Sequence, residues 1–191
     1  MFLKSENFLF HKKQFLTEEK SKKLINFYED NPNKINGVVA NSIVVEEKKK
    51  CKQISVSFER NITNSLITSI RYELKISCKE LSNRYKFLNA IPGWKVDDLF
   101  NIQKYEPGEA YFAEHCEHMP EKPQRILAWM IYLNTVTDKG GTNFPHQNVT
   151  LKPKVGDLWI WPASWTHSHK GIPSPTQIKY IATGWISYSL V

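Results

Sequence analysis

The sequence predicts a mainly β protein of the α+β class, in which a double-sheet β roll carries supporting helices on its outer side. Short apolar or alternating runs, broken by Pro, Gly and Asn, recur every ~8–12 residues from residue 94 onwards. Before them lies a longer stretch with apolar residues at three- and four-residue steps, which indicates a helix with one buried face. The length of 191 residues suits a single domain, 1–191, with a supporting part, 1–92, and a core, 93–191.

The supporting part is expected to combine helices and strands. Thr17 can cap a helix over Glu18–Asp30, which the following Asn-Pro-Asn ends. The runs Val38–Val45 and Cys51–Phe58 are rich in β-forming residues and favour strands. Between them, the charged residues Glu46–Lys50 indicate a solvated hairpin tip.

A longer helix is expected from about Thr63 to Leu88, because apolar residues line one of its faces. Cys78 fits that face as a small buried residue. After this helix the short runs predict the strands of the roll. These strands are Leu99–Tyr105, Tyr111–Cys116, Arg125–Asn134, Gly141–Pro145, Val149–Leu151, Asp157–Trp161, Thr166–His169 and Ile178–Tyr188.

The composition excludes several classes of protein. No run of about 18 apolar residues is present, so no membrane span is expected. The first residues lack the apolar stretch of a secretory signal, which predicts a cytoplasmic location. Three widely spaced cysteines without a C-x-x-C motif argue against a disulfide framework and a zinc module. A net charge of +7, from 26 Lys and Arg against 19 Asp and Glu, favours an anionic partner such as nucleic acid, an acidic metabolite or an acidic protein.

Two short clusters of histidines lie in the β-rich half. In an extended strand, His115 and Glu117 point to the same side, so an imidazole and a carboxylate can enter one cavity. His167 and His169 offer a further imidazole, and a regular strand would place both on one side. Two nitrogens and one carboxylate on one side of a metal, with the other positions open, are what a non-haem Fe(II) oxygenase needs.

Lys179 adds a cation to this pattern. It lies ten residues after His169, beyond the turn at 171–175, in the apolar run Ile178–Ile181. A lysine in such a run is costly to bury without a partner. A hairpin of this length would bring Lys179 back past His169, so its ammonium group could face an anion lying between it and the metal.

Several motifs between Asn101 and Tyr188 occur in the order and at the spacing of a known family. They are Tyr105–Gly108 with Tyr111, His115–Glu117, Ile131–Asn134, Gly140–Phe144, Lys152–Asp157, His169–Gly171, Lys179–Tyr180 and Thr183–Trp185. On these motifs the stretch resembles the catalytic core of the 2-oxoglutarate- and Fe(II)-dependent dioxygenases, most closely the prolyl 4-hydroxylase branch. The resemblance implies a double-stranded β-helix core, jelly-roll or cupin-like, and an oxidoreductase.

The resemblance also implies roles for particular residues. The implied iron ligands are His115, Glu117 and His169. Lys179 is implied to bind the distal carboxylate of 2-oxoglutarate, helped by the hydroxyls of Tyr105 and Tyr132. The implied substrate-binding residues are Arg125, Tyr111 and Trp185. The implied cofactors are Fe(II), 2-oxoglutarate and O₂, with ascorbate as a further candidate.

The activity that the resemblance implies is hydroxylation of a prolyl residue in a peptide or protein, with succinate and CO₂ as co-products. One alternative is a demethylase of nucleic-acid bases in the same superfamily, which the positive charge and the lysines at 48–50 would suit. That branch normally has arginine where this chain has Lys179, which favours the prolyl branch. Another alternative is a metal-binding β roll with weak turnover, because Glu117 stands where the family usually has the shorter Asp.

Overall fold

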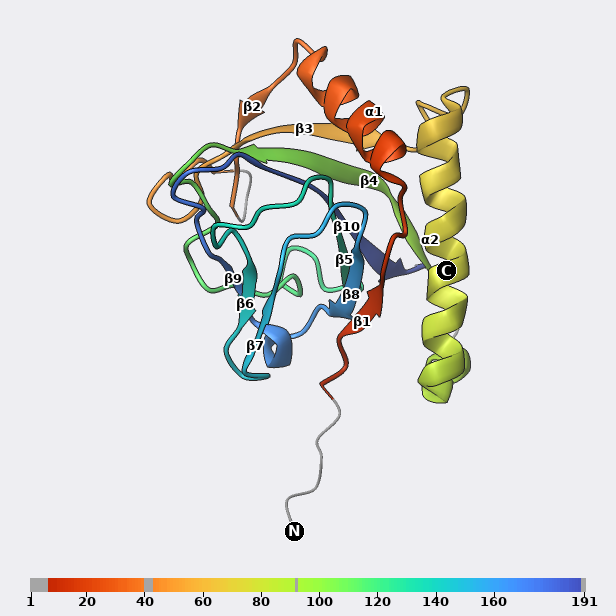
Figure 1. Cartoon of the computed structure of the whole chain (residues 1–191). Coiled ribbons are helices and arrows are strands. Elements are labelled where there is room, and N and C mark those ends of the chain that lie inside the picture. The colour runs from red at the N-terminus through yellow and green to blue at the C-terminus, as the bar shows by residue number, and fades with distance from the viewer. Residues whose placement is uncertain (1–6, 40–42, 92, 190–191) are drawn as a thin grey trace.

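The computed structural model describes residues 7–39, 43–91 and 93–189, and it has the predicted mainly β architecture (Figure 1). Two helices and most of the strands coincide with predicted elements, with shifts of a few residues at their ends. The elements in chain order are β1 (Phe10–Lys12), α1 (Glu18–Glu29), β2 (Ile35–Asn36), β3 (Lys52–Ser57), α2 (Ser65–Arg84), the 3-10 helix η2 (Lys86–Ala90), β4 (Trp94–Tyr105), β5 (Arg125–Tyr132), β6 (Thr142–Phe144), β7 (Val149–Leu151), β8 (Leu158–Pro162), the 3-10 helix η3 (Trp165–His167), β9 (Lys170–Gly171) and β10 (Lys179–Tyr188).

The strands form two sheets that face each other. The large sheet has the order β1-β8-β5-β10-β4-β3-β2, and the small sheet has the order β7-β6-β9. Every pair of neighbouring strands is antiparallel. The N-terminal part adds three strands to the large sheet as well as two helices. This arrangement is the double-sheet roll that the sequence predicts, with its interior open between the sheets.

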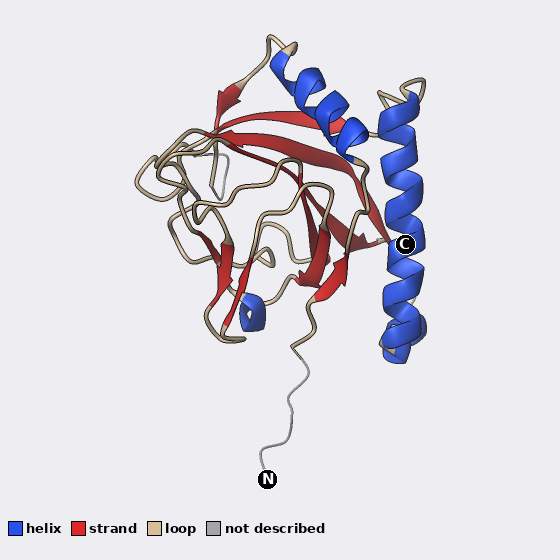
Figure 2. Ribbon diagram, viewed as in Figure 1, coloured by secondary structure: helices blue, strands red, loops and turns tan. Residues whose placement is uncertain are grey.

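The helices α1 and α2 lie on the outer side of the large sheet, away from the small sheet (Figures 1 and 2). Thr17 caps α1, since its side chain accepts a hydrogen bond from the backbone N–H of Lys20. Asn64 caps α2 in the same way. Leu74 and Ile70 are fully buried on the inner face of α2, which explains the apolar periodicity of this segment. In the described residues no helix is both long and apolar enough to cross a membrane.

Alternating residues of β5 supply two separate cores. Trp129 and Ile131 belong to the core between the large sheet and the helices. Met130 and Tyr132 belong to the core inside the roll. Successive side chains of a strand point to opposite faces, so a strand that is buried on both faces reads as a continuous apolar run. The interior of the roll is where the metal-binding candidates lie.

Two predicted strands are irregular in the structure. Residues 111–116 make only isolated bridges, Tyr111 with Lys49 and His115 with His169, because the segment changes its pairing partner midway. Residues 166–169 begin in η3 instead of a strand. There the hydroxyls of Ser164 and Thr166 lie 2.7 Å apart, a local contact that competes with strand pairing.

The other differences concern the N-terminal part. The strand predicted over 38–45 is absent from its described residues, and 40–42 lie outside the described part of the chain. The strand β1 is not predicted, because its sequence Phe-His-Lys is too short to show a pattern. It pairs with β8 through Phe10, which lies opposite Ile160.

Candidate metal centre

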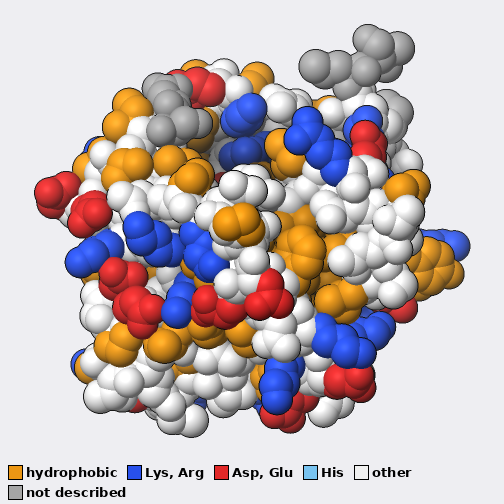
Figure 3. Space-filling view, turned by 90° about the horizontal axis from the view of Figure 1, so that it is seen from above, with side chains coloured by type: hydrophobic (Ala, Val, Ile, Leu, Met, Phe, Trp, Pro, Cys, Tyr) orange, Lys and Arg blue, Asp and Glu red, His pale blue; other side chains and the backbone are white. Residues whose placement is uncertain are grey.

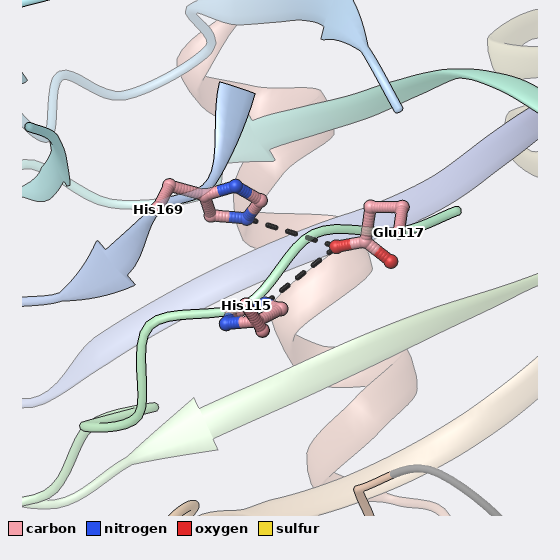
Figure 4. A group of neighbouring side chains, drawn as sticks. All are labelled: His115, Glu117 and His169. Atoms are coloured by element: carbon pink, nitrogen blue, oxygen red, sulfur yellow. Dashed lines mark ion pairs between the residues drawn. The ribbon is translucent and has the colours of Figure 1, made fainter. Parts of the chain in front are cut away.

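Three side chains from two distant parts of the sequence lie next to one another (Figure 4). The ligand atoms of His115, Glu117 and His169 all lie within 4.8 Å of one another. Oε1 of Glu117 is 3.6 Å from Nε2 of His115 and 3.7 Å from Nε2 of His169. Two imidazole nitrogens and one carboxylate oxygen on one side form the donor set of non-haem Fe(II) sites, so these residues suit that ion.

Backbone pairing brings the three ligands together. His115 and His169 exchange both of their backbone hydrogen bonds, at 3.0 and 2.8 Å. This antiparallel bridge places their imidazole rings side by side, with centroids 4.4 Å apart. The backbone N–H of Glu117 donates to the carbonyl of Ala163, which follows β8. The loop 113–118 is therefore fixed to two elements of the roll, although it is not a regular strand.

Both imidazoles are oriented for metal binding. Nδ1 of His115 lies 3.0 Å from the carbonyl of Ala113, and Nδ1 of His169 lies 3.0 Å from the carbonyl of His167. A proton on each Nδ1 satisfies these carbonyls and leaves the lone pair of Nε2 toward Glu117. Burial, followed by the neighbouring His169, lowers the pKa of His115 to about 4. Burial also lowers the pKa of His169, so both rings are neutral at pH 7 and free to bind a metal.

The carboxylate of Glu117 divides its two oxygens between different contacts. Oε1 faces the histidines, whereas Oε2 accepts a 2.6 Å hydrogen bond from Nε1 of Trp185. Arg125 lies 3.7 Å from Oε2, and its guanidinium group stacks on the Trp185 ring at 3.6 Å. Burial opposes the ionisation of Glu117, but the two histidines, Trp185 and Arg125 outweigh it and hold its pKa below the usual value.

The remaining histidines lie elsewhere. Nε2 of His167 is 3.0 Å from the carbonyl of Asn7, because η3 turns this residue away from the cluster. His169 is thus the histidine of this pair that joins the metal cluster. Nε2 of His11 lies 2.7 Å from the carboxylate of Asp157, close to β1.

The cluster opens into a cavity of about 710 Å³. Its wall includes eight of the nine site residues that the sequence singles out, all except Tyr132. Lys49, Gln53, Gln103 and Thr142 line the same cavity. 

Two of the eight, Lys179 and Trp185, reach the wall from β10. Aromatic side chains pack against the imidazoles. The ring of Tyr111 stacks on that of His115, with ring centroids 3.6 Å apart. The sequence therefore predicts the residues around the metal cluster and Lys179, and the structure adds further polar members of the wall.

Lys179 is buried, with 3% of its surface exposed. Its Nζ donates a 3.0 Å hydrogen bond to the carbonyl of Gly140 and lies 4.7 Å from the ring centre of Tyr105. Burial lowers the pKa of Lys179 to about 8. No carboxylate of the described residues pairs with this ammonium group, so the cavity offers a positive charge to an anion that enters it.

The two tyrosines predicted to help Lys179 differ in position. Tyr105 lines the cavity, and its hydroxyl donates to Oε1 of Gln103 at 2.7 Å. Tyr132 is fully buried behind the wall, with its hydroxyl 2.9 Å from Oγ1 of Thr142. Thr142 itself lines the cavity; it lies in the Gly140–Phe144 motif but is not among the predicted site residues.

The sequence also overlooks a group of polar residues in the wall. Lys49, Gln53 and Gln103 line the cavity and are almost completely buried. Gln53 and Gln103 lie opposite each other on β3 and β4. Their alternation with apolar residues on these strands is the signal that could have indicated inward-facing polar side chains.

Comparison with known proteins shows a similarity of the core to one superfamily. Residues 100–187 match the model of the 2OG-Fe(II) oxygenase superfamily. The chain is 31% identical over 113 residues to a protein of Acanthamoeba polyphaga mimivirus named "Putative prolyl 4-hydroxylase". This alignment covers 50% of the chain and 46% of the mimivirus protein, so the chain spans less than half the length of that relative.

Solved structures share the fold over nearly the whole chain. A viral collagen prolyl hydroxylase from Paramecium Bursaria Chlorella virus-1, in complex with 2OG, superposes with a TM-score of 0.67 at 19% identity, covering 96% of this chain and 97% of that one. A prolyl hydroxylase from Trichoplax adhaerens, in complex with a hypoxia inducible factor peptide, superposes with a TM-score of 0.71 at 17% identity, covering 95% and 84%. Residues 100–187 are thus similar to the 2OG-Fe(II) oxygenase superfamily, and the chain resembles prolyl 4-hydroxylases in sequence and fold.

Proposed function

We propose that this protein is an Fe(II)- and 2-oxoglutarate-dependent hydroxylase that acts on a prolyl residue of a peptide or protein. The observation that carries the proposal is the placement of a two-histidine, one-carboxylate cluster and a buried, unpaired lysine in the wall of one cavity. The match to the superfamily and the prolyl hydroxylase fold support it. Ascorbate as a reductant and a cytoplasmic location stay predictions of the sequence.

In this proposal His115, Glu117 and His169 hold the metal. Bound Fe(II) would supply the activation of O₂, with one oxygen atom passing to the substrate as a hydroxyl and the other to 2-oxoglutarate as it is converted to succinate and CO₂. The two Nε2 atoms and Oε1 would be the atoms that hold the metal. The opposite side stays open to the cavity for the cosubstrate and O₂.

Lys179 is proposed to bind the distal carboxylate of 2-oxoglutarate. Its ammonium group is held by the carbonyl of Gly140 and stands against the ring of Tyr105, so it needs little reorganisation to accept an anion. Because the site is buried, the attraction between the two charges is stronger than in water. The hydroxyls of Tyr105 and Thr142 line the same cavity and can donate to that carboxylate.

The substrate is proposed to enter beside Arg125, Tyr111 and Trp185, which line the cavity around the metal cluster. The Trichoplax relative binds a peptide, and the sequence relatives carry prolyl 4-hydroxylase names, which supports a proline-containing peptide. The surface seen in Figure 3 supports this choice over nucleic acid. Basic and acidic side chains are interspersed there and do not form a continuous basic patch.

Succinate formation tests the proposal. The purified protein is supplied with Fe(II), 2-oxoglutarate and either proline-rich peptides or methylated oligonucleotides. We expect the peptides to stimulate succinate release and to gain 16 Da for each hydroxyl, roughly one oxygen atom. Stimulation by the oligonucleotides alone would favour the demethylase, and succinate release by neither would favour a metal-binding module.

The two neighbouring histidines provide a matched pair of variants for the same assay. His169→Ala is expected to abolish activity, because it removes a nitrogen from the metal cluster. His167→Ala is expected to keep activity, because its ring contacts Asn7 outside the cluster. The reverse result would assign the metal to the other histidine.

A further inference from the structure

Lys49 is a second buried lysine in the wall of the cavity. It belongs to the charged segment 46–50 that the sequence predicts to be solvated, yet only 5% of its surface is exposed. Its Nζ donates hydrogen bonds to Oε1 of Gln53 at 2.9 Å and to the carbonyl of Val38 at 3.2 Å. Both acceptors are neutral, and Lys49 makes no ion pair with any described residue.

Neighbouring residues fix the position of this ammonium group. A Cβ atom at Gly37 would lie 3.1 Å from Cε of Lys49 and 2.5 Å from Sγ of Cys51, so the backbone of residue 37 packs closely against the lysine stem. Nζ lies 5.3 Å from the ring centre of Tyr111. The same ring stacks on His115, so one aromatic side chain contacts both the lysine and the metal cluster.

The charge of Lys49 lacks an anion even when the proposed function is taken into account. Of the two carboxylates of 2-oxoglutarate, one would chelate the metal and the other would pair with Lys179. The one carboxylate of the described residues whose charge is seen to act on Lys49 is that of Glu117, whose oxygens already face His115 and Trp185. Burying an ammonium group among neutral acceptors costs free energy, which a carboxylate bound beside it would offset.

We propose that Lys49 binds a carboxylate of the substrate, so that the enzyme selects peptides carrying a carboxylate close to the target proline. This inference rests on the proposed function and deepens it by naming a class of substrate. The carboxylate can come from an acidic side chain next to the proline or from the C-terminus of the peptide. Lys49 would then determine specificity, while Lys179 serves the cosubstrate.

Matched peptides test this selection. Four proline peptides are compared that carry either Glu or Gln beside the proline and either a free or an amidated C-terminus. For the wild-type protein we expect kcat/KM, measured as peptide-dependent succinate formation, to be about ten- to a hundredfold higher for the peptide with the recognised carboxylate. The pair that shows this ratio identifies the source of the carboxylate.

Variants of Lys49 show whether this lysine creates the ratio. Lys49→Met keeps the length of the side chain but removes the charge, and the ratio is expected to fall close to one through a higher KM for the carboxylate peptide. Lys49→Gln keeps a donor for Gln53 and is expected to behave in the same way, which guards against a folding defect in one variant. Lys48→Met is the control, because Lys48 is exposed and adjacent, and it is expected to retain the wild-type ratio.

Two results would overturn the inference. One is a wild-type ratio near one for both pairs of peptides. The other is a rise in the KM for 2-oxoglutarate in Lys49→Met with an unchanged peptide ratio, which would assign Lys49 to the cosubstrate. Calorimetric binding of the same peptides, without turnover, separates this inference from the proposed function. Binding that depends on both the carboxylate and Lys49, in a protein that forms no succinate, would uphold the lysine site and reject the hydroxylase.

Discussion

At the scale of single residues, Glu117 has two tasks that a shorter side chain cannot combine. Oε1 lies toward His115 and His169, and Oε2 accepts the hydrogen bond of Trp185. That hydrogen bond favours a single-oxygen contact with the metal and leaves a coordination position free. The glutamate that replaces the usual aspartate therefore fits its surroundings, and the structure gives no reason to regard it as a sign of lost activity.

Glu117→Asp is expected to weaken metal binding about ten- to a hundredfold, because the shorter carboxylate cannot reach both the histidines and Trp185. Titration with Mn²⁺ as a stable substitute for Fe(II), followed by calorimetry, measures this change. Trp185→Phe removes the indole N–H that donates the hydrogen bond to Glu117. The two substitutions together should cost less than the sum of the separate losses. Strict additivity would show that the Trp185 contact does not position the carboxylate.

Lys179 should make the binding of 2-oxoglutarate depend on pH. Burial lowers its pKa to about 8, so the ammonium charge is present below that pH and is lost as the pH rises through it. The affinity for 2-oxoglutarate is therefore expected to fall by up to about tenfold per pH unit above pH 8. Calorimetry between pH 7 and pH 10 measures this slope (roughly three pH units around the pKa). Lys179→Met should bind weakly at every pH, and a slope that persists in this variant would assign the titration to another group.

Residues of the site could be predicted from the sequence to different extents. The histidines and Glu117 stand in a short motif, and Lys179 stands out as a charge in an apolar strand. Lys49 lies among charged neighbours, and nothing in its local pattern separates it from the exposed Lys48. Its burial depends on Gly37 and Gln53, contacts that form only when the chain is folded.

At the scale of elements, long periodic segments follow the sequence and short irregular ones do not. The helix α2 and the strands β4 and β10 carry repeated apolar positions that specify both the element and its buried face. The segments 111–116 and 166–169 have β-forming residues, but their partners change within a few residues. His115 and His169 lie in these two segments, and Glu117 directly follows the first, so the least regular parts of the roll carry its chemistry.

The face of α2 that packs on the large sheet should contribute strongly to stability. Leu74 is fully buried in the core between the helices and this sheet. Leu74→Ala is expected to lower the free energy of unfolding by about 2–5 kcal/mol, because it leaves a cavity in a tightly packed layer. Lys75→Ala is the control on the exposed face and is expected to change it by less than about 0.5 kcal/mol. Urea unfolding followed by circular dichroism measures both, and equal effects would contradict this packing.

At the scale of the whole molecule, the site joins parts of the chain that are far apart. The loop 113–118 pairs with His169 and Ala163, and Lys49 before β3 faces the same cavity. The double-sheet architecture could be predicted from the number and spacing of short apolar runs. Which side chains meet across the roll depends on strand order and register, which local patterns do not contain.

Ligand binding at such a junction should stabilise the entire fold. Mn²⁺ and 2-oxoglutarate together, at about a hundred times their dissociation constants, are expected to add about 3 kcal/mol for each site that is filled independently. This corresponds to a rise in melting temperature of at least about 5 °C. Differential scanning fluorimetry measures the rise. His169→Ala should lose most of it, and an equal rise in that variant would place the metal outside the cluster.

The two-sided burial of β5 has a consequence for how the chain tolerates change in length. Trp129 faces the helices and Met130 faces the roll, so neighbouring positions belong to different cores. Inserting or deleting one residue within β5 would move each later side chain of the strand to the opposite face of the sheet. A change before Trp129 would point its large indole into the roll. It would also point Met130, which now faces the roll, toward the helices. Insertions in this chain are therefore expected to be tolerated in the loops around the strand, and the strand itself should keep a fixed length.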